Sequence, residues 1–157
     1  MRVLAADPGY ERLGIAVLEQ NDSKEDLLYS DCFQTNKDLS FEDRLLQLGK
    51  EFERLLHLYK PKAFASEALF FAKNQKTAID VASVRGALMY TAKKRELPFF
   101  EYTPLQIKMA VTGYGKSDKQ QVTEMVKKLV TIKKKIRFDD EFDAIAVGLT
   151  CLASERF

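Results

Sequence analysis

Four acidic residues occupy positions where a carboxylate is costly for a folded chain. Asp7 and Glu67 each end a short apolar run, and Asp140 and Asp143 open the apolar segment that follows them. Each acid therefore lies where a core element meets solvent. If the two strand ends and the helix start lie side by side, the four carboxylates converge, and bound divalent cations relieve their mutual repulsion. This pattern predicts metal-assisted cleavage of a phosphodiester.

The types and spacing of these acids also indicate which metal they bind. Asp140 and Asp143 are three residues apart, so on a helix their Cβ atoms lie about 5–6 Å from each other on one face. Oxygen-only ligands select a hard cation, so we expect two Mg²⁺ ions per site, with Mn²⁺ as a substitute. We expect Asp7 to bridge both ions because it leaves the central strand. Glu67 and Asp143 complete the coordination, and Asp140 is either a ligand or orients the attacking water.

Each acid near the chain's end has an ordinary structural alternative. Asp140 can be a helix N-cap, and Asp143 can face the positive end of the helix dipole. These roles do not explain why two strands also end in acids, so we favour the joint functional interpretation. The neighbouring Asp139 and Glu141 are expected to face solvent and to raise the local negative potential.

The elements that position these acids follow from the apolar pattern. Three β-rich runs joined by polar turns, Val3 to Asp7, Leu13 to Glu19 and Leu27 to Thr35, predict an antiparallel meander. Next we expect a helix capped by Ser40 that reaches Tyr59, a strand from Lys62 to Glu67, a helix from Thr77 to Arg95 and a strand from Pro98 to Tyr102. Three helices complete the chain. The first lies between Thr103-Pro104 and Gly113, the second runs from Asp118 to Thr131 and is capped by Ser117 with Gln120, and the last is capped by Asp139 or Asp140.

This order predicts one α/β domain over residues 1–157, with a five-stranded mixed sheet flanked by helices. Right-handed crossovers place the fourth strand beside the first and the fifth beyond it, which gives the strand order 3-2-1-4-5. Asp7 and Glu67 then project from adjacent parallel strands. The fold therefore predicts that the first two acids meet at one edge of the sheet.

Composition indicates the kind of partner. No apolar run approaches the roughly 20 residues of a membrane span, so we expect a cytoplasmic protein with no membrane partner. The net charge is +2, but residues 105–137 hold nine Lys or Arg against two acids. A basic segment directly before the acidic site suits a polyanion whose phosphate is delivered to bound metals. For Lys127 and Lys128, a solvated helix face is an equally good alternative.

Several motifs, in order over nearly the whole chain, resemble the RuvC family of Holliday-junction resolvases. The most specific are the stretch from Glu67 to Asn74, which reads E-A-L-F-F-A-K-N, and Asp140-x-x-Asp143-Ala144; the others are Asp7-Pro8-Gly9 with Gly14, Arg85-Gly86, and Gly113-Tyr114-Gly115 with Lys119. The resemblance implies a ribonuclease H-like fold, a homodimer with two sites, Mg²⁺ dependence, and paired nicks at a four-way DNA junction that leave 5′-phosphate and 3′-hydroxyl ends. It also implies a branch-migration motor as partner.

Carried over by position, the family's catalytic acids fall on the same four carboxylates, and its catalytically important basic positions fall on Lys108 and Lys119. Its base-stacking phenylalanine falls on Phe70, which can wedge between unstacked bases. The expected DNA-binding set is Phe70, Lys73, Asn74, Arg85, Lys116, Lys127 and Lys128. Leu13 and Ala68 depart from the family pattern, which leaves substrate preference and local site geometry open.

Two other interpretations stay open. Another ribonuclease H-like nuclease, acting on RNA or on other branched DNA, shares the acids but does not need Phe70 or a symmetric dimer. A junction-binding module without cleavage is a different class of function, although the presence of all four acids is evidence against it.

Overall fold

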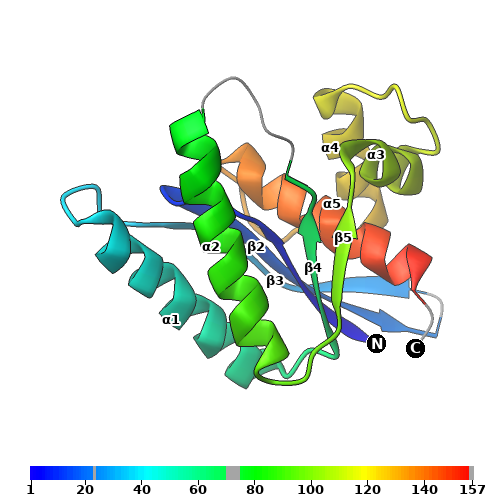
Figure 1. The fold of residues 1–157 in the computed structure, drawn as a ribbon. Coiled ribbons are helices and arrows are strands. Elements are labelled where there is room, and N and C mark those ends of the chain that lie inside the picture. Colours follow the sequence, from blue (N-terminus) through cyan, green and yellow to red (C-terminus); the bar gives the residue numbers. More distant parts are fainter. Residues whose placement is uncertain (23, 70–74, 156–157) are drawn as a thin grey trace.

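A central sheet separates two layers of helices in the computed structural model, which describes residues 1–22, 24–69 and 75–155 (Figure 1). The strands are β1 (Arg2–Asp7), β2 (Arg12–Asn21), β3 (Lys24–Gln34), β4 (Ala63–Glu67) and β5 (Phe99–Tyr102). Their order is β3-β2-β1-β4-β5, with β1, β4 and β5 parallel and β2 antiparallel to both of its neighbours. The predicted fold class and strand order are therefore confirmed.

Both faces of the sheet are covered because its central strands are apolar on both sides. The helices are α1 (Phe41–Tyr59), α2 (Gln75–Lys93), α3 (Pro104–Thr112), α4 (Lys119–Leu129) and α5 (Asp139–Ser154). One core joins α1 and α2 to alternate residues such as Leu4, Ile15 and Phe64. The other joins α5, α3 and α4 to the opposite face, around Ala5 and Leu18. In Figure 1, α1 and α2 lie in front of the sheet and α5 lies behind it.

The predicted start signals of two helices are confirmed. Ser40 caps α1 by accepting a hydrogen bond from the backbone N–H of Asp43. Thr103 forms a capping box with Gln106 at the start of α3, and Gly113 ends that helix at a φ of 76°, where glycine is favoured. The capping box at Thr103 begins α3 directly after the end of β5.

Two predicted caps are wrong by one or two residues. Asp118, and not Ser117, caps α4 and forms the capping box with Gln121. Ser117 is buried, and its hydroxyl donates to the carbonyl of Tyr114 at 2.7 Å, so it is not available to the helix. The N-cap of α5 is Phe138, which makes no side-chain cap hydrogen bond, so neither Asp139 nor Asp140 has the predicted capping role.

Close packing of α5 on the sheet depends on a glycine. A Cβ at Gly148 would lie 2.3 Å from a methyl carbon of Leu18 and 3.3 Å from the Cβ of Ala5. Only a residue without a side chain allows the helix to approach β1 and β2 this closely.

The third strand begins at Lys24, three residues earlier than predicted. In the described part of the chain, no helix is long and apolar enough to cross a membrane.

Candidate active site

The first two predicted acids end neighbouring parallel strands. Asp7 is the last residue of β1 and Glu67 is the last residue of β4. In the register of these strands Ala6 is paired with Ser66, so each acid is the next residue along its strand. The crossover through α1 therefore brings together two side chains that are 60 positions apart in the sequence.

The other two acids reach the same edge of the sheet at the start of α5. Asp7 pairs across the sheet with Gly14 of β2. A Cβ on Gly14 would lie only 1.9 Å from the carbonyl oxygen of Asp140. This contact places Asp140, in the first turn of α5, directly against the strand that neighbours Asp7, and Asp143 follows one turn later. Gly14 thus has a steric reason to be glycine.

The charges of these acids act on one another. The pKa of Asp7 is raised to about 8, first by burial and then by the neighbouring charges of Asp143, Glu67 and Asp140, in that order. The charge of Lys119 acts in the opposite direction. Burial, followed by the charge of Asp143, also raises the pKa of Glu67. The site thus holds more negative charge than its own cations compensate, and this excess favours a bound cation.

Lys119 is the cation nearest to two acids of α5. Its Nζ donates to Oδ2 of Asp143 at 2.9 Å and lies 3.6 Å from Oδ2 of Asp139. Burial raises the pKa of Asp143 even though the hydrogen bond from Lys119 lowers it. The side chain of Asp139 is 75% exposed, which confirms the prediction that it faces solvent.

Carboxylates are the donors that a hard cation requires. As the side chains lie, no three acidic, histidine or cysteine residues among those described are grouped closely enough to hold a metal ion. The donor set and the excess negative charge at Asp7 nevertheless fit a divalent cation. The two strand ends and the start of α5, which carry these carboxylates, share one edge of the sheet.

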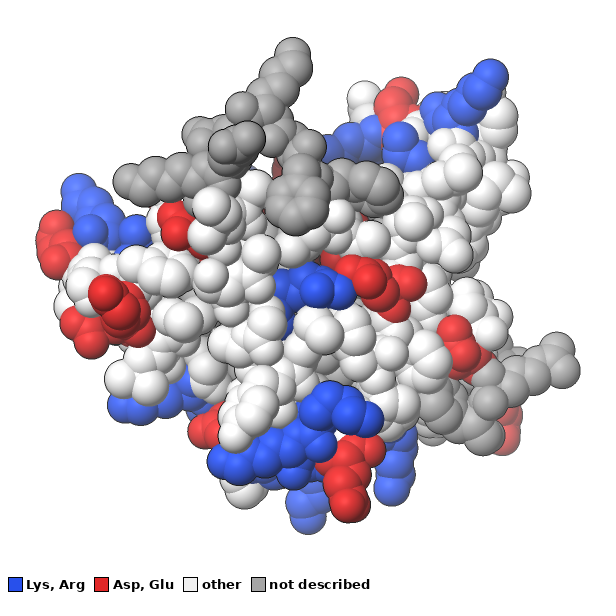
Figure 2. Space-filling model, viewed as in Figure 1, with Lys and Arg blue, Asp and Glu red and all other residues white. Residues whose placement is uncertain are grey.

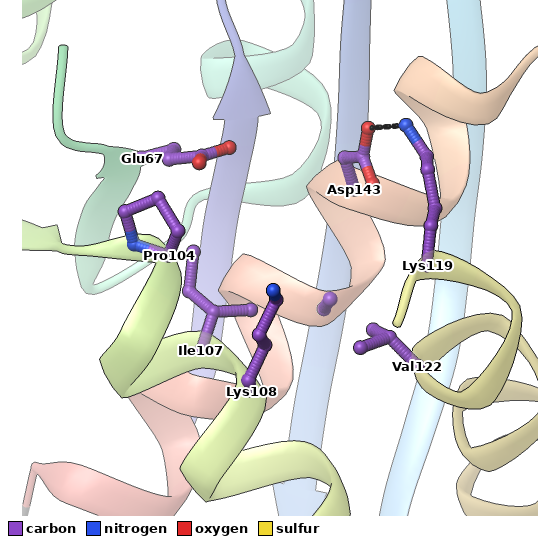
Figure 3. A pocket seen from close by; sticks show the side chains of 8 residues that line it. Glu67, Pro104, Ile107, Lys108, Lys119, Val122 and Asp143 are labelled. Carbon is purple, nitrogen blue, oxygen red and sulfur yellow. Dashed lines mark hydrogen bonds and ion pairs between the residues drawn. The ribbon is translucent and has the colours of Figure 1, made fainter. Parts of the chain in front are cut away.

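A pocket of about 280 Å³ opens beside the acids, between α3, α4 and α5 (Figure 3). Its lining includes the acids Glu67 and Asp143 and the predicted basic residues Lys108 and Lys119. In Figure 3, the side chain of Lys108 extends from α3 into the pocket, opposite the Lys119–Asp143 ion pair. Its remaining walls are apolar and consist of Pro104, Ile107, Val122 and Ala146. The pocket therefore brings both predicted lysines to the acids.

The predicted DNA-binding residues have different surroundings. Lys116 and Lys128 are exposed, and Lys127 is paired with Glu124 on the surface of α4. Arg85 is only 19% exposed, because it pairs with Glu101 of β5 and stacks on a neighbouring ring. Phe70, Lys73 and Asn74 lie outside the described residues.

The structure also contains a buried ion pair that contradicts one prediction. Glu141 was expected to face solvent, but only 3% of it is exposed. Its Oε1 accepts from the hydroxyl of Ser30 at 2.6 Å and lies 2.7 Å from Nζ of Lys134. A signal was available, because Glu141 is three and four residues before the buried Ala144 and Ile145 and thus shares their helix face.

A second contact that the sequence did not indicate involves Arg12. Its Nε lies 3.2 Å from Oδ2 of Asp140. Arg12 is the first residue of β2. Strand alternation places its side chain on the same face of β2 as Gly14, which α5 contacts, but does not identify Asp140 as its partner.

The sheet order, the helices on both of its faces and the acids at its central strand ends define an α/β protein of the ribonuclease H-like class with a candidate nuclease site. Residues 3–151 match the family model described as crossover junction endodeoxyribonuclease RuvC. The chain belongs to the RuvC family.

Individual relatives agree with this assignment. The crossover junction endodeoxyribonuclease RuvC of Thermosipho melanesiensis is 46% identical over 155 residues, which cover 99% of this chain and 98% of the relative. The protein of the same name from Fusobacterium nucleatum is 38% identical, with 98% and 81% covered. Among solved structures, T. thermophilus RuvC in complex with Holliday junction substrate superposes with a TM-score of 0.91 at 29% identity, covering 98% of this chain and 93% of the other. The yeast mitochondrial resolvase Ydc2, at 16% identity and a TM-score of 0.72 with 96% and 77% covered, shares the fold.

Proposed function

We propose that this chain is a structure-specific endonuclease that resolves four-way DNA junctions by paired, symmetric nicks. The observation that carries the proposal is the meeting of two strand ends and the start of α5 at one edge of the sheet, in a chain of the RuvC family. The relative of known structure in complex with a Holliday junction supports the choice of substrate. Residues 1–157 would act as one nuclease domain.

The four acids Asp7, Glu67, Asp140 and Asp143 would hold two Mg²⁺ ions, with Mn²⁺ as a substitute. Such ions, when bound, lower the pKa of water to give a hydroxide nucleophile and stabilise the leaving 3′-oxygen. The pKa of Asp7, raised to about 8 by burial and by its acidic neighbours, supports this site because a cation offsets the charge that the protein leaves uncompensated.

Two lysines of the chain would offset the negative charge of the phosphate. Lys119 holds Asp143 through a 2.9 Å hydrogen bond, which limits the repulsion between that acid and an incoming phosphate. Lys108 places a second ammonium group in the pocket, where it can stabilise negative charge that develops during cleavage. The apolar walls of the pocket reduce competition from water.

Exposed lysines near the site would hold the rest of the junction. Lys116, Lys127 and Lys128 are exposed and belong to the basic segment before α5. Phe70, Lys73 and Asn74 lie between β4 and α2 in the sequence, so they follow Glu67 closely, and we keep the proposal that Phe70 stacks on junction bases. For Arg85, the ion pair with Glu101 supports a structural role, and a DNA contact would require this pair to open.

The homodimer is supported by the exposed surface of α2. Figure 2 shows the face of the molecule that α1 and α2 form, where an uncharged area lies along α2. On that helix Ile79 is 63% exposed and Tyr90 is 68% exposed, and the small exposed residues Ser83 and Gly86 lie between them at helical spacing. Such a stripe suits close packing of two helices. The branch-migration motor partner and the cytoplasmic location stay predictions.

The test of the dimer is Tyr90→Glu, which places a charge on the stripe without touching the acids. We expect a monomer by sedimentation equilibrium and loss of the paired nicks, because two sites must act on one junction. A dimer of unchanged stability would show that α2 is not part of the interface.

The function is tested by mapping cuts on a mobile four-way junction, linear duplex, RNA/DNA hybrid and structured RNA in Mg²⁺. We expect symmetric nicks on the junction, with 5′-phosphate and 3′-hydroxyl ends, and little cutting of the other substrates. Preference for hybrid or RNA would identify a different ribonuclease H-like nuclease. Junction binding without cleavage in either Mg²⁺ or Mn²⁺ would identify a binding module.

A further inference from the structure

Two protein cations hold the acids of α5 from different parts of the chain. Lys119, at the start of α4, pairs with Asp143. Arg12, at the start of β2, pairs with Asp140 through its Nε at 3.2 Å. Lys119 is an expected site residue, whereas Arg12 has no assigned role. Its position beside a predicted metal ligand raises the question of what it does there.

The guanidinium of Arg12 is held by an aromatic ring. Its central carbon lies 4.8 Å from the centroid of the Phe138 ring, within the range of a cation–π contact. Phe138 is the N-cap of α5, where Ser, Thr, Asp or Asn is favoured, and it makes no side-chain cap hydrogen bond. The helix thus begins with a residue that does not satisfy its backbone donors but does support Arg12.

One oxygen of Asp140 receives the contacts of the surrounding protein. Oδ2 faces Nε of Arg12 at 3.2 Å and Sγ of Cys32 at 4.0 Å. The backbone of Asp140 is fixed as well, because its carbonyl lies against Gly14. These contacts restrict the rotation of the carboxylate and leave Oδ1 as the oxygen that a cation would take.

We propose that Arg12 is a positioning residue of the metal site, which holds Asp140 so that its second carboxylate oxygen is ready for a divalent cation. The inference rests on the proposed function. Partners that orient a metal ligand from outside the coordination shell typically contribute 10- to 100-fold to metal affinity. The positive charge of Arg12 opposes cation binding, but its side chain is 47% exposed and screened by solvent, so positioning is the larger effect.

The test measures Mn²⁺ affinity of the full-length protein without DNA, by electron paramagnetic resonance of free Mn²⁺. We expect Arg12→Ala to weaken binding by about tenfold or more. Arg12→Lys keeps the charge but loses the planar fork, so it should recover only part of the affinity. The matched control is Arg137→Ala, because the guanidinium of Arg137 lies 5.0 Å from the centroid of the same Phe138 ring. It removes an equal charge and should change the affinity by less than about twofold.

A double-mutant cycle shows whether Arg12 acts through Asp140. In an Asp140→Asn background, itself weaker for Mn²⁺, Arg12→Ala should have no further effect, because its target carboxylate is gone. An equal loss in both backgrounds would mean that Arg12 acts elsewhere and would overturn the inference. Thermal unfolding of each variant separates this effect from a general loss of structure.

Other results also overturn the inference. Unchanged or tighter Mn²⁺ binding by Arg12→Ala would make Arg12 a competitor of the metal or a spectator. Weaker junction binding at unchanged Mn²⁺ affinity would make it a phosphate contact. Because the assay contains no DNA, the proposed function can fail separately: wild-type protein whose Mn²⁺ affinity depends on Arg12 but which cuts no junction would refute the function alone. Absence of Mn²⁺ binding by the wild type would refute both.

Discussion

Replacement of Gly14 by alanine should separate the start of α5 from the sheet. The new Cβ would lie 1.9 Å from the carbonyl oxygen of Asp140 and 2.5 Å from its carbonyl carbon, so one backbone must move by about an ångström to restore van der Waals contact. Overpacking of this kind costs about 1–3 kcal/mol. We expect the upper part of that range, because the obstacle is backbone and not a flexible side chain. For a chain of this length, each kcal/mol lowers Tm by roughly 2–4 °C.

The same substitution should reduce cleavage more than stability alone explains. Misplacement of catalytic groups by about 1 Å can lower a rate on the order of 100-fold. Because α5 carries both Asp140 and Asp143, its displacement moves half of the acids together. The assays are urea denaturation and junction cleavage at saturating enzyme, below the temperature at which the variant unfolds.

Gly49→Ala is the matched control for this prediction. Gly49 lies inside α1, and a Cβ there meets nothing within 4 Å. The same methyl group should therefore stabilise the protein, by about 0.5–1 kcal/mol, through helix propensity. If Gly14→Ala and Gly49→Ala shift stability in the same direction, or if Gly14→Ala cleaves junctions at the wild-type rate, the proposed steric role of Gly14 is wrong.

Asp7→Asn should abolish nicking and leave junction affinity unchanged or higher in a gel-shift assay, because it removes a negative charge beside the phosphate; loss of binding would contradict this role. Because the pKa of Asp7 is raised from 3.8 to about 8, the folded metal-free protein keeps a proton that the unfolded chain loses, so stability should fall as pH rises from about 4 to about 8. Thermal unfolding in EDTA at both ends of this range should show a shallower fall for Asp7→Asn than for the wild type, and equal slopes would refute the assignment. Lys127→Ala and Lys128→Ala should each lower the salt slope of junction binding by about 0.9 if the lysine contacts a phosphate, whereas an unchanged slope would favour a solvated helix face. Lys134→Ala leaves Glu141 buried without its 2.7 Å ion pair. Because the side chain of Lys134 is 46% exposed, water can take the place of its ammonium group, and we expect the free energy of unfolding to fall by about 1–3 kcal/mol in urea denaturation. A similar loss for Lys134→Ala in a Glu141→Gln background would show that the pair is not its cause.

The strand order and the meeting of the acids could be predicted because they follow from few rules. The apolar runs that end in Asp7 and Glu67 are short and bounded, and the handedness of crossovers leaves one neighbour for β1 on its free side. Once those strands are adjacent and parallel, their last residues must lie close together. This part of the site needs no knowledge of side-chain packing.

The predictions from sequence were wrong or incomplete where the surroundings of a side chain depend on tertiary contacts. Ser117 has the same local preference for capping as Asp118, but the fold buries its hydroxyl against the carbonyl of Tyr114. The cluster of acids at the start of α5 suggested that Glu141 faces solvent, but this residue shares a helix face with the core and pairs with Lys134. The partner of Arg12 depends on how α5 lies against β2, because strand alternation gives only the face of the sheet on which the arginine lies.

The helix that carries Asp140 and Asp143 is also among the most completely buried elements of the protein, with all residues from Ala144 to Leu152 in the core. The proposed metal ligands are therefore joined directly to a part of the molecule that we expect to open last, and not to a surface loop that can fray independently. Amide protons of the buried run from Ala144 to Leu152 should exchange with deuterium only through opening of the whole domain. Heat inactivation should then coincide with unfolding, and mutations deep in the sheet should alter cleavage even where they contact neither DNA nor metal.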